Sequence, residues 1–235
     1  MRGSKIVIIS EDAQLRRLMR MALGSNGYEV ADAFPGEDDL AQVRTELADL
    51  VLIARKENAL ETCRSVRAGS DVPVIVVSLQ NAPGDVVAAL DAGADDFVAQ
   101  PFRTEELLAR IRAVMRRSVC AAGPAPVRLT LDGVVIDFAS RRVTAHQEVR
   151  HLTPKEFELL RYLVSHAGKV VAHRTLLQAI WGPDYDGQVD YLRVFINQLR
   201  KKIELDPSRP KFILTEPWVG YRFAPPEPLL QARAS

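Results

Sequence analysis

Residues 189–203 read VDYLRVFINQLRKKI, and this segment decides how the second half of the chain is interpreted. Its apolar side chains recur at spacings of 3, 4, 3 and 4, which places them on one stripe of an α-helix. The stripe consists of Val189, Leu192, Ile196, Leu199 and Ile203. The opposite face carries Asp190, Arg193, Val194, Asn197, Gln198 and Lys201. The pattern therefore predicts a helix that buries one side and presents hydrogen-bonding groups on the other.

The polar face of this helix has two interpretations. Arg can form paired hydrogen bonds to guanine, and Asn or Gln can do the same to adenine, while Lys reaches guanine or a phosphate. In an isolated helix, an ordinary solvated face would explain the same residues. The cluster Arg200-Lys201-Lys202 favours DNA, but basic residues also interact favourably with any helix C-terminus. The neighbouring segments have to decide between the two.

Those neighbours are short strands followed by helices. Strands are predicted at 127–131, 134–138, 142–145 and 148–151, and Asp132-Gly133 is a hairpin signal between the first two. Thr153-Pro154-Lys155-Glu156 predicts a helix start with a capping box, and Gly168 ends that helix. A second helix is predicted at 173–181 and a closing hairpin at 211–216 and 220–223. Three helices closed by a hairpin predict an α+β winged helix-turn-helix, which favours the DNA interpretation.

The first half of the chain alternates strand and helix patterns. Apolar or β-branched runs occur at 5–10, 28–32, 49–54, 73–78 and 96–100. Helical patterns lie between them, for example Leu107, Leu108, Ile111 and Met115. This alternation predicts an α/β domain with a five-stranded parallel sheet covered by helices on both faces.

Charge and composition agree with two domains of different function. Residues 1–118 carry 15 Lys and Arg against 18 Asp and Glu, a net charge of −3, whereas residues 119–235 carry 16 against 12, a net of +4. We expect a domain at 1–118, a linker at 119–126, a DNA-binding domain at 127–225 and a tail at 226–235. The basic half is the one expected to meet an anionic polymer.

Other classes of protein are disfavoured. No apolar run approaches the roughly 20 residues that a membrane helix needs, and no secretory signal opens the chain, so a cytoplasmic location without membrane contact is expected. Cys63 and Cys120 fit neither a disulfide framework nor a metal cluster. We expect no cofactor and no metal site.

Residues 127–224 resemble the effector domain of the OmpR/PhoB family of response regulators. The resemblance rests on the stretches 152–160 (LTPKEFELL), 176–182 (LLQAIWG), 199–203 (LRKKI) and 220–223 (GYRF). Residues 181–183, 191–193 and 206–210 are most similar to the KdpE group, regulators of potassium-uptake operons. The resemblance implies that the helix at 188–205 enters the major groove and that the loop 182–187 faces RNA polymerase.

The residues expected to contact double-stranded DNA follow from this resemblance. They are Tyr191, Arg193, Val194, Asn197, Gln198, Arg200, Lys201, Lys202, Trp218, Tyr221 and Arg222. The wing tip departs from the family, because Pro217-Trp218 stands where small or basic residues are usual. Trp218 is expected either to lie along the sugar-phosphate edge or to pack inward.

Residues 5–117 resemble the receiver domain of the same family, which has a flavodoxin-like (CheY-like) fold. The resemblance is strongest at 92–97 (AGADDF), 101–102 (PF) and 106–117 (ELLARIRAVMRR). A working receiver needs an acidic pair that holds a divalent metal, an Asp nucleophile, a Ser or Thr, and a Lys. The chemistry requires them because a carboxylate attacks a phosphoryl group whose charge is held by a cation, a Lys and a hydroxyl.

Most of these positions are altered here. Ala54 occupies the nucleophile position and Gln100 the Lys position, while the acidic pair has become Ser10-Glu11, followed by Asp12; only Ser78 is retained. We therefore predict that the receiver has no catalytic residue and accepts no phosphate on an aspartate. Glu11 and Asp12 are expected either to be neutralised by Arg55 or Lys56 in place of metal, or to be a solvated surface pair.

The resemblance also implies a homodimer through the fourth helix, fifth strand and fifth helix of the receiver. The residues expected at this interface are Val87, Leu90, Asp95, Asp96, Glu106, Arg110 and Arg112. Val86, Val87 and Leu90 either form an apolar contact patch or pack on the sheet.

The leading interpretation is a transcriptional regulator that binds DNA as a dimer without phosphorylation. The alternative is a sensor whose degenerate receiver binds a partner protein or a small ligand to control DNA binding. An enzyme is disfavoured because the sequence contains neither a nucleophile–base pair nor a phosphate-binding Gly loop.

Overall fold

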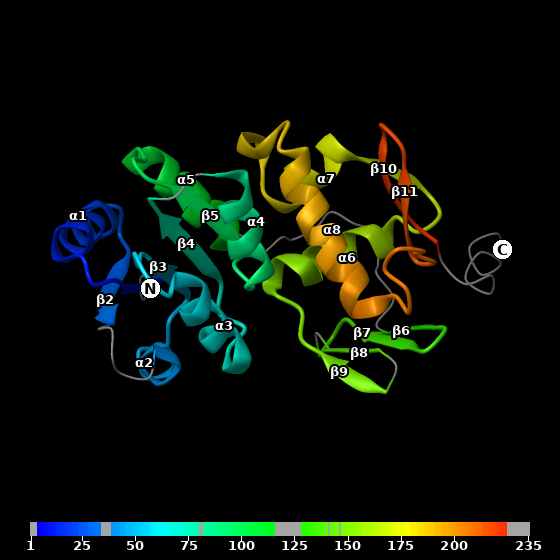
Figure 1. The fold of residues 1–235 in the computed structure, drawn as a ribbon, viewed down its shortest axis with the longest axis horizontal. Coiled ribbons are helices and arrows are strands. Elements are labelled where there is room, and N and C mark those ends of the chain that lie inside the picture. The colour runs from blue at the N-terminus through cyan, green and yellow to red at the C-terminus, as the bar shows by residue number, and fades with distance from the viewer. Residues whose placement is uncertain are drawn as a thin grey trace. The chain divides into compact units, whose positions relative to one another are not determined.

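The computed structural model describes residues 4–33, 39–79, 82–115, 128–140, 142–145 and 147–224. The chain divides into two compact units, Met1–Arg117 and Ser118–Ser235 (Figure 1). The predicted linker at 119–126, the predicted tail at 226–235 and Cys120 lie outside the described residues. Among the helices of the described residues, none combines the length and the apolar character needed to cross a membrane.

The first unit is an α/β fold built on a five-stranded parallel sheet, as predicted. The sheet order is β2-β1-β3-β4-β5. Its strands are β1 (Lys5–Ile9), β2 (Glu29–Ala33), β3 (Leu50–Ile53), β4 (Val74–Ser78) and β5 (Asp96–Ala99). Its helices are α1 (Ala13–Gly24), α2 (Asp39–Thr45), α3 (Ala59–Gly69), α4 (Pro83–Asp91) and α5 (Thr104–Met115).

Helices cover both faces of this sheet, which explains the continuous apolar runs of the strands. Alternate strand residues such as Ile6, Leu52 and Ile75 share one buried cluster with residues of α1 and α5. Buried Cys63 of α3 lies outside that cluster, and burial raises the pKa of its thiol to about 12. Because the thiolate is the reactive form, Cys63 is a packing residue.

The second unit has the predicted winged-helix elements. A four-stranded antiparallel sheet, in the order β6-β7-β8-β9, precedes three helices, and a three-stranded sheet, in the order β10-β12-β11, closes the unit. The strands are β6 (Arg128–Leu131), β7 (Val134–Asp137), β8 (Arg142–Ala145), β9 (Glu148–Arg150), β10 (Val170–Ala172), β11 (Ile213–Glu216) and β12 (Gly220–Phe223). The helices are α6 (Pro154–Ser165), α7 (His173–Ile180), the 3₁₀ turn η1 (Pro183–Tyr185) and α8 (Val189–Ile203).

Helix α6 begins with the capping box predicted from the sequence. The Thr153 hydroxyl accepts a hydrogen bond from the Glu156 backbone N–H at 3.3 Å, and Glu156 Oε2 accepts one from the Thr153 N–H at 2.7 Å. The same Glu156 oxygen lies 2.6 Å from Lys202 Nζ at the end of α8. One buried carboxylate therefore caps α6 and holds it to the predicted DNA-reading helix.

Strand β10 was not predicted, although it completes the sheet that supports the wing. It pairs antiparallel with β12, with Val171 opposite Tyr221 and Ala172 opposite Gly220. A Cβ on Gly220 would lie 1.9 Å from the Val171 carbonyl oxygen, so this close approach requires glycine. The hydrophobic pattern of three residues was too short to reveal a strand.

Candidate functional site

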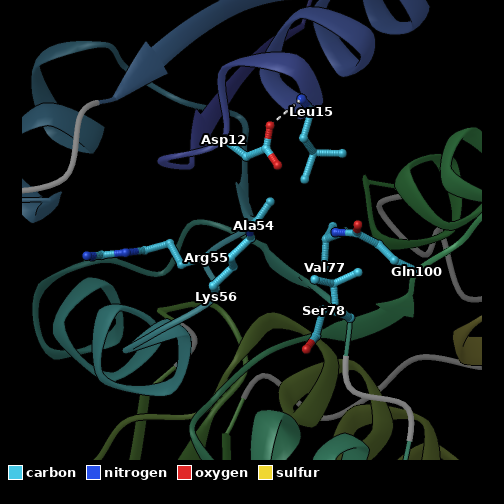
Figure 2. A pocket seen from close by; sticks show the side chains of 9 residues that line it. Asp12, Leu15, Ala54, Arg55, Lys56, Val77, Ser78 and Gln100 are labelled. Atoms are coloured by element: carbon cyan, nitrogen blue, oxygen red, sulfur yellow. Dashed lines mark hydrogen bonds between the residues drawn. The ribbon is translucent and has the colours of Figure 1, made fainter.

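The predicted nucleophile position lies at the carboxyl edge of the parallel sheet. Ala54 directly follows β3, and its backbone N–H donates to the Ile9 carbonyl oxygen at 2.9 Å. A cavity of about 210 Å³ lies here, and Figure 2 shows the side chains that line it. It is lined by Asp12, Leu15, Ala54, Arg55, Lys56, Val77, Ser78, Leu79 and Gln100. The methyl group of Ala54 thus stands at a sheet edge where α/β proteins commonly bind ligands.

Ser78 and Gln100 come from the ends of the two neighbouring strands. They meet through the backbone, because the Gln100 N–H donates to the Ser78 carbonyl oxygen at 2.7 Å. Ala54, Ser78 and Gln100, three positions that the family uses for phosphoryl transfer, thus line one cavity. The side chains that they carry here are a methyl, a hydroxyl and a neutral amide, so none of the three supplies a nucleophilic carboxylate or a positive charge.

Asp12, the carboxylate lining this cavity, serves as the N-cap of α1. Asp12 Oδ1 accepts hydrogen bonds from the backbone N–H groups of Gln14 at 2.9 Å and Leu15 at 3.0 Å. The Leu15 N–H is the largest cause that holds the pKa of Asp12 below its usual value. The buried Ser10 hydroxyl accepts from the Asp12 N–H at 3.2 Å. Asp12 is therefore committed to helix capping.

Glu11 is bound by the segment that follows Ala54. Glu11 Oε1 accepts a hydrogen bond from the Lys56 backbone N–H at 2.6 Å, and Oε2 lies 3.7 Å from Arg55 Nε. Arg55 Nη1 in turn donates to the Thr62 hydroxyl of α3 at 2.8 Å. Of the two expectations for the acidic pair, neutralisation by Arg55 agrees with these contacts for Glu11. Within the described ranges, no group of three or more His, Cys, Asp or Glu side chains could hold a metal ion.

The predicted DNA-reading face of α8 is narrower in the structure. Arg193, Asn197 and Lys201 are exposed and Gln198 is half-buried, but Tyr191 and Val194 are only 7% and 9% exposed. Tyr191 packs among Trp181, Tyr185 and Phe195, with its ring centroid 5.6 Å from that of Trp181. Tyr191 and Val194 therefore offer little surface for a contact with DNA, and their assignment to DNA stays a prediction. Helix α8 packs against both α6 and α7, so its buried arc is wider than a single stripe.

Two of the basic residues assigned to DNA have partners inside the domain. Arg200 donates from Nε and Nη2 to the Ile213 carbonyl oxygen at 3.0 and 2.6 Å, and from Nη2 to the Thr215 hydroxyl at 2.8 Å. Lys202 pairs with Glu156, whose side chain is 4% exposed. Arg200 and Lys202 therefore hold α8 to its neighbours, and their assignment to DNA stays a prediction.

The wing carries one of the most exposed side chains of the described residues. Trp218 is 99% exposed and has φ 66°, in the left-handed region that disfavours a bulky side chain. The alternative that Trp218 packs inward is therefore wrong. On the following strand, Tyr221 is buried and Arg222 pairs with Glu216 at 2.7 Å, and the assignment of both residues to DNA stays a prediction. The wing thus presents an aromatic ring to solvent in place of a basic side chain.

The sequence also missed how Arg193 is held. Arg193 Nη1 lies 2.6 Å from Asp190 Oδ1, one helical turn earlier. Burial raises the pKa of Tyr221 on β12, and the charges of Arg200 and then Arg193 oppose this rise. The i,i+3 spacing of Asp190 and Arg193 was the available signal. Arg193 is therefore pre-oriented between α8 and the wing.

Several predicted dimer residues are buried within the receiver. Leu90, Asp95 and Asp96 are at most 4% exposed. Asp95 accepts from the Val74 N–H at 2.9 Å and pairs with Arg67, while Asp96 pairs with Arg110 at 3.2 Å. Both carboxylates are therefore used inside the fold, and the assignment of these residues to a dimer interface stays a prediction.

The remaining predicted dimer residues have different positions. Arg110 is half-buried between Asp96 and Glu106, whereas Val87, Glu106 and Arg112 are exposed. Of the two expectations for Leu90, burial in the receiver is the one that the structure supports. The exposed surface of α4 and α5 is therefore smaller than the sequence suggested.

A receiver-type α/β unit joined to a winged-helix unit defines a DNA-binding response regulator. Comparisons agree: the family described as response regulator receiver domain matches residues 6–112, and that described as transcriptional regulatory protein, C terminal, matches residues 146–223. The chain belongs to the OmpR/PhoB family of response regulators.

Among its relatives is the KDP operon transcriptional regulatory protein KdpE of Escherichia coli (strain K12). The two are 38% identical over 223 residues, which cover 94% of this chain and 99% of that protein. KdpE of Mycobacterium tuberculosis (strain ATCC 25618 / H37Rv) is 38% identical over 221 residues, 93% of this chain and 98% of the relative.

Two solved structures of similar chains cover nearly the whole length of this one. DrrB, a Thermotoga maritima OmpR/PhoB homologue, is 30% identical with a TM-score of 0.49, covering 94% of this chain and 99% of that one. A cysteine-to-serine mutant of RitR is 21% identical with a TM-score of 0.75, covering 95% of this chain and 100% of that one, and supports the fold alone.

Proposed function

We propose that this protein regulates transcription by binding DNA as a homodimer, without phosphorylation of an aspartate in its receiver. The observation that carries the proposal is Ala54 at the end of β3, where a methyl group lines the cavity in place of a nucleophile. Asp12 lines the same cavity, but its carboxylate caps α1. Gln100 supplies no positive charge for a phosphoryl group.

Incubation with acetyl phosphate or a histidine kinase tests the absence of phosphorylation. We expect no acid-labile phosphate in the intact mass and no change in operator affinity. A response regulator with an intact aspartate, treated in the same reaction, is the positive control. A stoichiometric phosphate on any aspartate of the receiver would refute this part of the proposal.

For DNA reading, we propose Arg193, Asn197, Gln198 and Lys201 on α8, together with Trp218 on the wing. Arg193 and Asn197 are exposed, and Arg193 is oriented by Asp190, so both can make paired contacts to base edges. Lys201 is exposed and suits a phosphate or guanine. We leave the buried Tyr191, Val194 and Tyr221 out of the proposed interface.

Base selection from a random DNA pool measures these contacts. Arg193→Ala and Asn197→Ala should each relax preference at one base position, by about 1–3 kcal/mol per lost paired contact. Arg150→Ala, on β9, removes a similar charge outside the proposed interface and is the matched control. Unchanged selection by both α8 variants would contradict the assignment.

Dimerisation is proposed through the exposed side chains of α4 and α5, namely Val87, Glu106 and Arg112. A single winged helix reads few base pairs, so two linked copies would select an operator better. Sedimentation of Arg112→Glu should show a lower dimer fraction and weaker operator binding, and Glu106→Arg in the same chain should restore part of both. Arg17→Glu, which reverses the charge of an exposed residue on α1, is the control. A fully dimeric Arg112→Glu variant would move the interface elsewhere.

We assign the segment 182–187 between α7 and α8 to contact with RNA polymerase. Tyr185 is buried with its ring centroid 6.5 Å from that of Trp181, which anchors the segment, while Asp184 is exposed. Asp184→Ala should reduce transcription in a purified system and leave operator affinity unchanged. Equal transcription by the variant and the unaltered protein would refute the assignment.

A further inference from the structure

The resemblance to receivers implies a divalent metal ion, and the residues of this chain do not fit one. A hard cation needs several oxygen ligands, usually carboxylates. Here the first acidic position is the buried Ser10, the nucleophile position is Ala54, and Asp12 is engaged by two backbone N–H groups of α1. Glu11 is left as the carboxylate that could turn to such an ion.

Both oxygens of Glu11 face groups of the β3–α3 segment. Oε1 accepts from the Lys56 N–H at 2.6 Å, and Oε2 lies 3.7 Å from Arg55 Nε. The hydrogen bond joins parts of the chain that are 45 residues apart in sequence. These contacts connect the loop after β1 to the loop after β3, the same two loops that a metal ion would bridge in a working receiver.

The guanidinium of Arg55 is itself held in place. Its Nη1 donates at 2.8 Å to the hydroxyl of Thr62, which is 3% exposed on α3, and the Arg55 side chain is 17% exposed. In Figure 2 the Arg55 side chain extends away from Gln100, so it leaves the space above Ala54 open. Arg55 therefore connects Glu11 to α3 without filling the cavity.

We propose that the Arg55 guanidinium replaces the divalent metal ion, so that Glu11, Arg55 and Lys56 hold the two loops together permanently. An Arg side chain stays charged at all physiological pH values, and it cannot dissociate from the protein as an ion can. The arrangement of the two loops is thus independent of the Mg²⁺ concentration. This inference deepens the proposed phosphorylation-independent function, since it explains how the receiver keeps its shape without metal.

Calorimetric unfolding of the full chain with and without millimolar Mg²⁺ or Mn²⁺, at matched ionic strength, tests the proposal. The Tm of the unaltered protein should not change with either ion. Arg55→Gln should lower the Tm by up to about 4 °C and make it rise again with divalent ions, because Glu11 then lacks its counter-charge. Arg55→Lys keeps the charge and should stay unresponsive to the ions.

Two further variants separate this role from an ordinary ion pair. Glu11→Gln combined with Arg55→Gln should lose the response to divalent ions, since the carboxylate is gone. Arg20→Gln breaks the 2.6 Å pair with Asp32 in the same unit and should create no such response. Hydrogen exchange of the Lys56 amide should rise in Glu11→Gln.

Mg²⁺ stabilisation of the unaltered protein, or an Arg55→Gln variant that ignores divalent ions, would overturn the proposal. No phosphodonor is present in these measurements. Their failure is therefore distinguishable from failure of the phosphorylation-independent function, which the mass measurement tests separately.

Discussion

Replacing Trp218 with glycine should weaken DNA binding without destabilising the protein. Trp218 is 99% exposed, so its ring contributes no burial to the free protein. Its φ of 66° costs an L-residue about 1–2 kcal/mol, whereas glycine adopts this conformation freely but loses about 0.5–1 kcal/mol through unfolded-state entropy. The free energy of unfolding of Trp218→Gly should therefore equal that of the unaltered protein or exceed it by up to about 1.5 kcal/mol.

The expected loss in binding follows from the area of the ring. A Trp side chain can bury about 150–250 Å², and one ring face against a sugar-phosphate edge covers roughly 100 Å². At about 25 cal/mol per Å², this contact stabilises the complex by about 2.5 kcal/mol before the cost of ordering the ring. A net of about 1–2 kcal/mol corresponds to a Kd raised about 5–30-fold.

Two readouts distinguish this role. The chain has two tryptophans, of which Trp181 is fully buried, so a change in emission on adding operator DNA should come from Trp218 and vanish in Trp218→Gly. Anisotropy of labelled DNA gives the Kd. Leu205→Ala, which removes another exposed apolar side chain, should leave both readouts unchanged.

The reasoning is refuted by a Trp218→Gly variant that binds operator as tightly as the unaltered protein. A large loss of stability in that variant would equally refute the view that the ring is held out for DNA. Trp218→Phe, which keeps an aromatic face, should retain part of the affinity.

Three other changes give distinct outcomes. Lys202→Met leaves the buried Glu156 without its counter-charge and should lower the free energy of unfolding by about 1–3 kcal/mol, measured in urea, while the salt dependence of DNA binding keeps its slope. Gly220→Ala should lower the free energy of unfolding by about 1–3 kcal/mol or more, because its Cβ meets the Val171 carbonyl oxygen. A variant that unfolds in urea at the same concentration as the unaltered protein would contradict this. Asp12→Ala should flatten the fall of the unfolding free energy at acid pH. Folding lowers the pKa of Asp12 from 3.8. Its contribution to stability is therefore present above pH 3.8 and is lost as the pH falls through the lower pKa of the folded state.

The sequence predicted the elements well because their signals are local. Thr153 and Glu156 lie three residues apart, and both hydrogen bonds of the capping box formed as expected. Asp132-Gly133 likewise predicted the β6–β7 hairpin, in which Leu131 pairs with Val134. Such patterns depend on neighbours in sequence and not on the packing of the whole domain.

The sequence did not predict the contacts in which a residue meets a partner distant in the chain. Arg200 and Lys202 were assigned to DNA as part of a basic cluster, but their partners lie in β11 and α6. Tyr191 has a polar hydroxyl and stood outside the apolar stripe, yet the aromatic cluster around Trp181 buries it. Asp96 finds Arg110 across the β5–α5 turn. Periodicity along one helix carries no information about these contacts.

The separation of charges along α8 bears on how such a regulator can evolve. Arg200 and Lys202 hold the domain together, whereas Arg193, Asn197 and Lys201 are exposed and contribute little to its packing. Under the proposed reading of DNA by the second group, substitution there redirects the protein to a different operator at little risk to folding, because exposed positions tolerate change. A duplicated copy of the gene could therefore acquire new target promoters through a few changes on one helix face, with the scaffold inherited intact.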